Sequence, residues 1–290
     1  MKKLINLILA GTILFLAGAC QHKIPELKVM TFNIRFDNPA DGINAWPNRV
    51  PIVETYLVEE MPDIIGVQEA LHHQVTDLEK MLPGFTRVGT GRNDGCQSGE
   101  YSPIYFNNEI FELIEHGQFW LSETPEVPGS IGPGAVLPRI ATWAHLKLKT
   151  SGKQIFVFNT HFCHVSDEAR WLSAKIMTDR MQQIAGKNAL IVTGDFNFDI
   201  ESETYAKVAN LFLKNNNLKN AVATELSFSD SNQGTFNGFG NIENQPFIDF
   251  VFASNHFEVI SSTIDRLKSG DVFISDHWPV VANLRLKHTK

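Results

Sequence analysis

The fold is decided by the stretch IVTGDFNFD, residues 191–199. The apolar residues 189–192 predict a buried strand, which Gly194 interrupts. Because residues two apart in an extended chain face the same side, Asp195 and Asn197 are predicted to face one point at the strand end. Ligands bind at such strand ends in open α/β sheets, and a carboxylate beside a carboxamide suits a hard cation or a phosphoryl oxygen. The alternative is a capped turn without chemistry, because Asp and Asn are common turn residues.

The composition predicts a globular protein with a large core. The chain has 290 residues, of which 43% are hydrophobic and 20% charged, so a single large domain is permitted and global disorder is excluded. The net charge of -7 argues against a broad basic surface for nucleic acid. It leaves room for a local site at which a metal supplies the positive charge.

The N-terminus has the pattern of an export signal. Lys2 and Lys3 precede an apolar run, residues 4–16, and small residues then lead to Cys20. The run is short for a membrane span. The segment resembles a bacterial lipoprotein signal, which predicts cleavage before Cys20 and a lipid on that cysteine. Ala17 stands where a larger aliphatic residue is usual, so plain secretion is the alternative.

This signal divides the chain into three parts. Residues 1–20 are the predicted signal, residues 21–27 a tether, and residues 28–290 one domain. The domain is predicted to be exported and held on a bacterial membrane, facing the periplasm or the cell surface. No later apolar run is long enough to cross a bilayer.

Strands outnumber helices in the rest of the chain. Amphipathic spacing predicts helices at residues 49–60, 71–82, 167–185 and 202–212, with Asn48 and Ser202 as caps. Many neighbouring strands have no helix between them. This favours mixed sheets with flanking helices over a purely parallel sheet.

Polar side chains recur where the predicted strands end or begin. Asp249 is the most informative, because it lies in the apolar run FIDFVF, where an unpaired carboxylate would be costly. A histidine is its natural partner. The other residues of this kind are Asn33, Glu69, His161, Asp195, Asn197, Asp276 and His277.

Six short motifs follow one another in an order that resembles a known family. They are TFNI at Thr31, QE at Gln68, NTH at Asn159, GDFN at Gly194, IDFVF at Ile248 and SDHWPV at Ser275. Together they resemble the endonuclease/exonuclease/phosphatase superfamily, which includes DNase I-like nucleases, sphingomyelinases and phosphatases. The resemblance runs from about Lys28 to the C-terminus. It implies an α/β (α+β) fold, a four-layer, DNase I-like sandwich of two mixed β-sheets flanked by helices.

The resemblance also implies a role for each polar position. Glu69, Asn33 and Asp276 match the metal site, and Asn197 and Arg139 match phosphate-binding residues. The catalytic positions are Asp195, which orients or deprotonates water, His277 paired with Asp249, and His161 supported by Glu100.

These roles imply a Mg²⁺-dependent phosphoester hydrolase, with Mn²⁺ as a substitute ion, because Mg²⁺ prefers oxygen ligands and assists attack on phosphorus. The sequence favours a monomeric phosphodiesterase of nuclease type, acting on a nucleotide, sugar-linked or small phosphodiester. A phosphomonoesterase and a sphingomyelinase-type lipid phosphodiesterase are alternatives, and so is a non-catalytic binding lipoprotein on the same fold. Phe236 and Phe239 are expected either to form an aromatic wall of the substrate pocket or, as the equally weighted alternative, to be loop residues that pack into the core.

Cys96 and Cys163 are the cysteines of the predicted domain. Two cysteines do not make a disulfide scaffold, so two separate small buried residues are the default interpretation. A disulfide between them is a secondary hypothesis, and it depends on Glu100 meeting His161.

Overall fold

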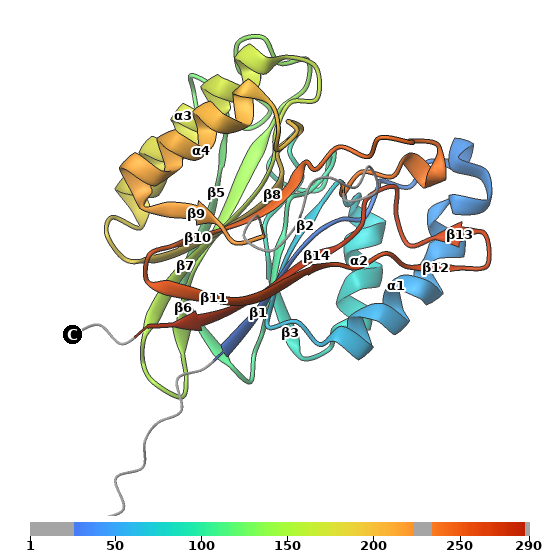
Figure 1. Cartoon of the computed structure of the whole chain (residues 1–290), viewed down its shortest axis with the longest axis horizontal. Helices are drawn as coiled ribbons and strands as arrows, with labels where there is room; N and C mark the ends of the chain where they lie inside the picture. Colours follow the sequence, from blue (N-terminus) through green and yellow to red (C-terminus); the bar gives the residue numbers. More distant parts are fainter. Residues whose placement is uncertain (1–25, 223–233, 288–290) are drawn as a thin grey trace, which may run out of the picture.

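The computed structural model describes residues 26–222 and 234–287. Two six-stranded sheets face each other and helices cover their outer faces (Figure 1). This is the predicted four-layer arrangement of mixed sheets. The predicted export signal and Cys20 lie outside the described residues, and so do residues 223–233. Within the described residues, no helix is both long and apolar enough to cross a membrane.

The first sheet contains the N-terminal strand at its centre. Its order is β11 (Phe257–Ile264), β14 (Val280–Leu286), β1 (Glu26–Asn33), β2 (Ile64–Gln68), β4 (Ile104–Asn107) and β3 (Phe85–Val88). The pair β1 and β2 is parallel and the other pairs are antiparallel. Strand β1 begins within the predicted tether, two residues before the predicted domain boundary.

The second sheet contains the strand of the opening motif. Its order is β5 (Phe111–Trp120), β6 (Ile140–Leu148), β7 (Gln154–His161), β8 (Ala189–Asp195), β10 (Asp249–Ser254) and β9 (Leu218–Asn220). Here β7 and β8 are parallel. A short ribbon of β12 (Lys268–Ser269) and β13 (Val272–Phe273) lies apart from both sheets.

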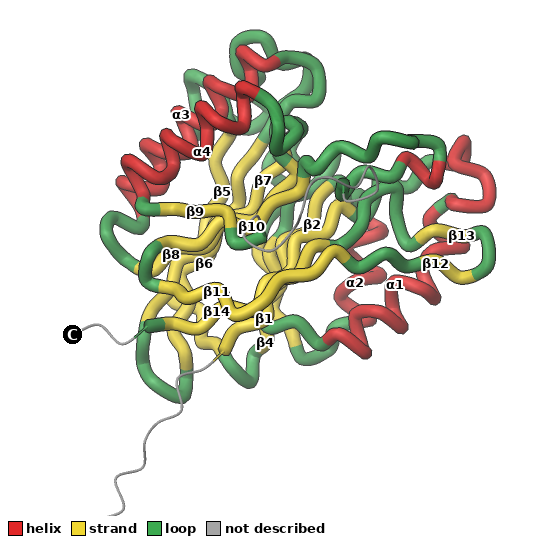
Figure 2. The backbone as a smooth tube through the Cα atoms, in the orientation of Figure 1, coloured by secondary structure: helices red, strands yellow, loops and turns green. Residues whose placement is uncertain are grey.

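Helices α1 (Trp46–Glu60) and α2 (His72–Met81) cover the first sheet, and α3 (Asp167–Ile184) and α4 (Glu203–Asn216) cover the second (Figure 2). The hydroxyls of Ser166 and Ser202 cap α3 and α4 by accepting backbone N–H groups, as their sequence suggests. Asn48 is not the cap of α1. That helix starts earlier because a proline in its first turn fits the helical φ angle. Two 3₁₀ turns are η1 (Pro39–Asn44) and η2 (Gly238–Gly240).

The core has two parts, one on each side of the first sheet. Successive residues of β1 point to opposite faces, so Val29 packs between the sheets while Met30 and Phe32 pack toward α1 and α2. Both faces of β1 are therefore apolar. A strand buried in this way is a rigid support for the polar residue at its end.

The parallel pairs bring chain-distant residues to one edge of the sandwich. Asn33 pairs with Gln68 across β1 and β2. His161 pairs with Asp195 across β7 and β8, and Asp249 lies opposite Asp195 on the other side. The ends of both sheets thus meet at a common polar edge.

Candidate active site

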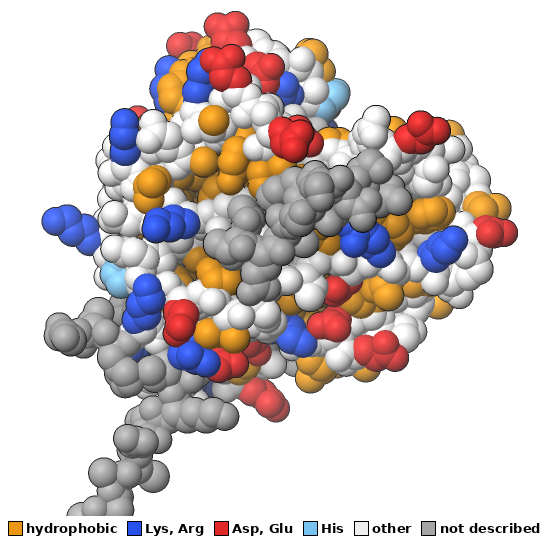
Figure 3. Space-filling view, in the orientation of Figure 1, with side chains coloured by type: hydrophobic (Ala, Val, Ile, Leu, Met, Phe, Trp, Pro, Cys, Tyr) orange, Lys and Arg blue, Asp and Glu red, His pale blue; other side chains and the backbone are white. Residues whose placement is uncertain are grey.

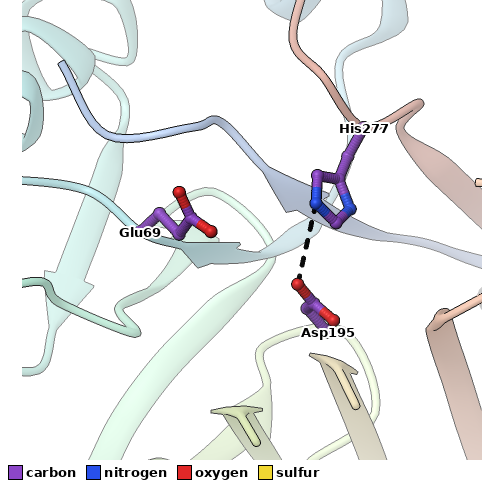
Figure 4. Close-up of side chains that lie close together, drawn as sticks. All are labelled: Glu69, Asp195 and His277. Carbon is purple, nitrogen blue, oxygen red and sulfur yellow. Dashed lines mark ion pairs between the residues drawn. The ribbon is translucent and has the colours of Figure 1, made fainter. Parts of the chain in front are cut away.

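Glu69, Asp195 and His277 form the centre of this edge. One ligand atom from each lies within 4.8 Å of the others, and Figure 4 shows the three side chains converging. Glu69 follows β2, Asp195 closes β8, and His277 precedes β14. The centre therefore depends on both sheets and forms only in the folded chain.

Asn33 connects the members of this centre. Its amide nitrogen lies 3.1 Å from Glu69 Oε1, 2.9 Å from Asp195 Oδ2 and 3.3 Å from His277 Nε2. Its amide oxygen accepts from the backbone N–H of Arg35. As placed, Asn33 turns a donor toward the carboxylates, whereas the predicted metal ligand would use the oxygen.

The opening motif forms a turn and also faces the site. Asn197 has a positive φ of 53°, so the chain is not extended there as predicted. Its backbone N–H donates to Asp195 Oδ1, and its amide donates to the carbonyl of Phe162. Asp195 and Asn197 nevertheless line the same cavity. The motif therefore forms the capped turn of the alternative interpretation, and the polar side chains of that turn also line a cavity.

His277 and Asp249 make the contact predicted for them. Nδ1 of His277 lies 2.8 Å from Asp249 Oδ2, and both residues are buried. Burial alone would lower the histidine pKa, but the charge and hydrogen bond of Asp249 raise it to about 10. Since the carboxylate accepts, the Nδ1 atom carries a proton and Nε2 faces Asn33 and Asp195.

Burial raises the pKa values of three carboxyl groups around this centre. Asp195 rises to about 7 through burial and the charge of Asp249. Asp276 rises to about 6 and Glu100 to about 7, in each case through burial first and with Glu69 contributing. Negative charge is thus concentrated where no cation neutralises it fully. This donor set of carboxylate oxygens fits a divalent ion such as Mg²⁺.

Asp276 stands beside the three-residue centre. Its Oδ2 atom lies 3.7 Å from Arg35 Nε, and its Oδ1 accepts from the hydroxyl of Ser275. It lines the cavity with Glu69. Arg35, which Asp41 holds through two hydrogen bonds, was not found from the sequence.

His161 lacks the hydrogen bond predicted for it. Glu100 lies 3.8 Å from His161 Nδ1, too far for a hydrogen bond, and that nitrogen has no partner within the described part of the chain. Arg92 instead binds Glu100 through both terminal nitrogens. Burial, followed by the charges of Arg139 and Arg92, lowers the His161 pKa well below its usual value. Its Nε2 lies 3.5 Å from Asp195.

Arg139 is buried in the cavity wall. Nε and Nη1 have no hydrogen-bond partner among the described residues, while Nη2 lies 2.9 Å from His164 Nδ1. A buried guanidinium with free N–H groups is suited to bind an anion. His164 and Arg92 were missed because neither lies in a motif, and their roles depend on side-chain contacts.

These residues surround a cavity of about 630 Å³. Its polar wall holds the carboxylates and histidines. Its apolar wall is formed by Phe36, Leu137, Phe236, Pro246 and Ile248. Phe236 therefore faces the site, as considered from the sequence, while Phe239 packs against Phe273. Leu137 lies between β5 and β6 and brings that connection to the site.

Cys96 and Cys163 are both free thiols. Cys96 is exposed and Cys163 is buried. The structure therefore has no disulfide between them. The default interpretation is correct for the separation of the two residues and for the burial of Cys163, and it is wrong for Cys96, which is exposed.

Comparison with known proteins decides the family. The Endonuclease/Exonuclease/phosphatase family matches residues 30–277, which contain every site residue named above. The chain belongs to this family. Its members are phosphoester hydrolases, and the fold has the expected DNase I-like architecture.

Solved structures of the family agree over nearly the whole chain. An endonuclease/exonuclease/phosphatase from Bacteroides vulgatus is 36% identical, with a TM-score of 0.82, covering 91% of this chain and 100% of that one. A mannosyl-6-phosphatase from Bacteroides thetaiotaomicron is 33% identical, with a TM-score of 0.78 and coverages of 89% and 99%. The human Nocturnin catalytic domain shares the fold at 21% identity, a TM-score of 0.72 and coverages of 91% and 94%.

Proposed function

We propose that this family member is a Mg²⁺-dependent phosphatase that hydrolyses small sugar phosphates. The observation that carries the proposal is the buried guanidinium of Arg139, a residue that lines the same cavity as the carboxylate centre and whose Nε and Nη1 lack partners among the described residues. A phosphomonoester offers three terminal oxygens to such donors, one more than a diester. The likeness to a mannosyl-6-phosphatase at 33% identity supports the same substrate class.

The residues around the centre divide the chemistry between them. Glu69 and Asp195 would hold Mg²⁺, which supplies positive charge to the phosphoryl oxygens. Asp195 also accepts the proton of the attacking water, because its carboxylate closes β8 within this centre and lines the cavity. The water oxygen bonds to phosphorus as the bond to the sugar oxygen breaks, and the proton taken by Asp195 returns through solvent to the sugar oxygen, which leaves as the alcohol.

The cationic side chains bind the phosphoryl group. Asp249 keeps His277 protonated, so that its Nε2–H can donate to a phosphoryl oxygen. Arg139 and the amide of Asn197 provide further donors from the cavity wall. Such preorganised donors stabilise charge that develops in the transition state.

The sequence-based preference for a nuclease-type phosphodiesterase receives less support from the surface. On the face shown in Figure 3, the Lys and Arg side chains of the described residues are scattered among Asp and Glu. A nucleic-acid groove would gather them along one path. A phosphodiester remains the second candidate, because the family includes such enzymes.

Hydrolysis of mannose 6-phosphate, measured as released phosphate with Mg²⁺ or EDTA, tests the function. Asp195→Ala and His277→Ala should each lower kcat at least about 100-fold. Exposed His116, which is outside the cavity lining, gives the control His116→Ala. Activity that persists in EDTA or in both site variants refutes the proposal. Bis-nitrophenyl phosphate as the better substrate would favour the diesterase.

We propose further that the enzyme is an exported, monomeric lipoprotein. The support for export and for the lipid is the N-terminal sequence alone, in which a charged start, an apolar run and small residues precede Cys20. Secretion without a lipid is the alternative.

A further inference from the structure

His164 contacts Arg139 and lies nearer to solvent than Arg139 does. Arg139 is 4% exposed, whereas His164 is an exposed residue, and both line the cavity. The pair therefore runs from the buried wall toward solvent. A phosphate bound at Arg139 would therefore lie next to His164.

The loop that carries His164 is fixed at both ends. The backbone N–H of Phe162 donates to the carbonyl of Asp195, and the carbonyl of Phe162 accepts from Asn197. Arg170 donates to the carbonyl of Cys163. Ser166 then caps α3. Only five residues, 162–166, separate β7 from α3, so these bonds hold the backbone on both sides of His164, and Arg139 holds the ring.

Arg139 determines the tautomer of His164. A guanidinium can only donate hydrogen bonds, so the Nδ1 atom 2.9 Å from Arg139 Nη2 must accept. A neutral imidazole that accepts at Nδ1 carries its proton at Nε2. Burial and the charge of Arg139 also lower the His164 pKa, which favours the neutral ring. Among the described residues, none forms a hydrogen bond with Nε2 of His164.

The structure therefore leaves the Nε2–H donor of His164 next to Arg139 in the lining of the cavity. Resting on the phosphatase function proposed above, we propose that the Nε2–H of His164 donates to a hydroxyl of the sugar leaving group and selects polyol phosphates. Arg139 binds the phosphate and fixes the tautomer of His164. His164 then recognises the sugar that is attached to the phosphate. An aryl leaving group has no hydroxyl for this donor.

The test compares mannose 6-phosphate with p-nitrophenyl phosphate in the full-length enzyme with Mg²⁺. His164→Ala removes both the acceptor for Arg139 and the outward donor. His164→Asn keeps an acceptor near the Nδ1 position and lacks the donor at Nε2. His116→Ala again serves as the control, and the melting temperature of each variant checks folding.

We expect His164→Ala to lower kcat/KM for mannose 6-phosphate about tenfold or more, the size of one lost hydrogen bond. His164→Asn should restore hydrolysis of p-nitrophenyl phosphate to within about twofold of wild type while the loss on mannose 6-phosphate remains. The ratio of the two kcat/KM values, which a purely structural role would not move, is the decisive readout.

Two results overturn the proposal while leaving the phosphatase intact. In one, His164→Asn restores both substrates, and His164 then acts only by positioning Arg139. In the other, the ratio is unchanged in both variants. If the wild-type enzyme hydrolyses neither substrate with Mg²⁺, the proposed function itself fails and the selectivity fails with it.

Discussion

The contact between His277 and Asp249 is the most specific residue-level feature of the site. Asp249→Asn removes the charge that keeps the imidazole protonated while preserving the side-chain shape. We expect kcat for p-nitrophenyl phosphate to fall about 100-fold or more, the usual contribution of a positioned acid or base. Steady-state kinetics with saturating Mg²⁺ would measure the loss.

Asp265→Asn is the matched control for this substitution. Asp265 also accepts one side-chain hydrogen bond, from the hydroxyl of Tyr56 at 2.7 Å, and it does not line the cavity. Its kcat should stay within about twofold of wild type. If Asp249→Asn retained activity within about threefold of wild type, the pair would have no catalytic role.

The raised carboxyl pKa values predict a cost in stability at neutral and alkaline pH. A carboxyl whose pKa is higher in the folded state stabilises the protein below its unfolded pKa, near 4, and this contribution is lost as pH rises through the folded value. For Asp195 the window runs from about 4 to about 7. Asp195→Asn should therefore be more stable than wild type in EDTA at pH 8.

Thermal unfolding of both proteins from pH 5 to pH 8 tests this expectation. The advantage of Asp195→Asn should reach the order of a few kcal/mol at pH 8 and shrink toward pH 5. Mg²⁺ at pH 8 should raise the melting temperature of the wild type more than that of the variant. A pH-independent difference between the two proteins would show that Asp195 ionises normally.

Residue identities in the site were largely predictable, and their contacts only partly so. The pairing of His277 with Asp249 was predicted because a buried carboxylate needs a partner. Arg92 was not predicted, because nothing in the sequence shows that it competes with His161 for Glu100. Such competition depends on side-chain distances of a few tenths of an ångström.

At the scale of elements, Gly66 in β2 allows the two sheets to approach at the site. A Cβ atom there would lie 2.0 Å from the hydroxyl of Thr193 and 2.6 Å from the amide oxygen of Asn159. That amide oxygen also accepts from Gln68, the residue before Glu69. We expect Gly66→Ala to lower the free energy of unfolding by about 1–3 kcal/mol, the cost of overpacking a core.

Urea unfolding measures this loss, with Gly84→Ala as the control. A Cβ atom on Gly84 meets nothing within 4 Å, so that variant should change stability by less than about 0.5 kcal/mol. Gly66→Ala should also lower kcat, because it displaces the strand that carries Glu69. Equal stability of the two variants would mean that the sheets can move apart freely.

The elements were predictable where they are long. Helices α2 and α3 begin and end within one residue of their predicted bounds, because their apolar spacing persists over several turns. Strands β9, β12 and β13 were missed, since two or three residues cannot show an alternating pattern. The pairing partners of each strand could not be predicted either, because strand register depends on distant parts of the chain.

At the scale of the whole molecule, the course of β1 determines where the active site lies relative to the N-terminal end of the described chain. The strand begins at Glu26, paired with Arg285, and ends at Asn33 in the site. Eight residues at about 3.3 Å each span about 26 Å. The described chain therefore enters the fold at the end of β1 opposite the catalytic edge. A lipid on Cys20, six residues before Glu26, would attach the enzyme by the far end and leave the cavity open to soluble substrates.

Metabolic labelling with an alkyne fatty acid tests this arrangement in bacteria that express the full chain. We expect the wild-type protein to take up the label and to hydrolyse mannose 6-phosphate added to intact cells or to spheroplasts. Cys20→Ser should lose the label. Cys96→Ser, which replaces an exposed cysteine of the folded domain, should keep it. Unlabelled wild-type protein in the medium would establish secretion instead, because a lipid anchor retains its carrier on the membrane.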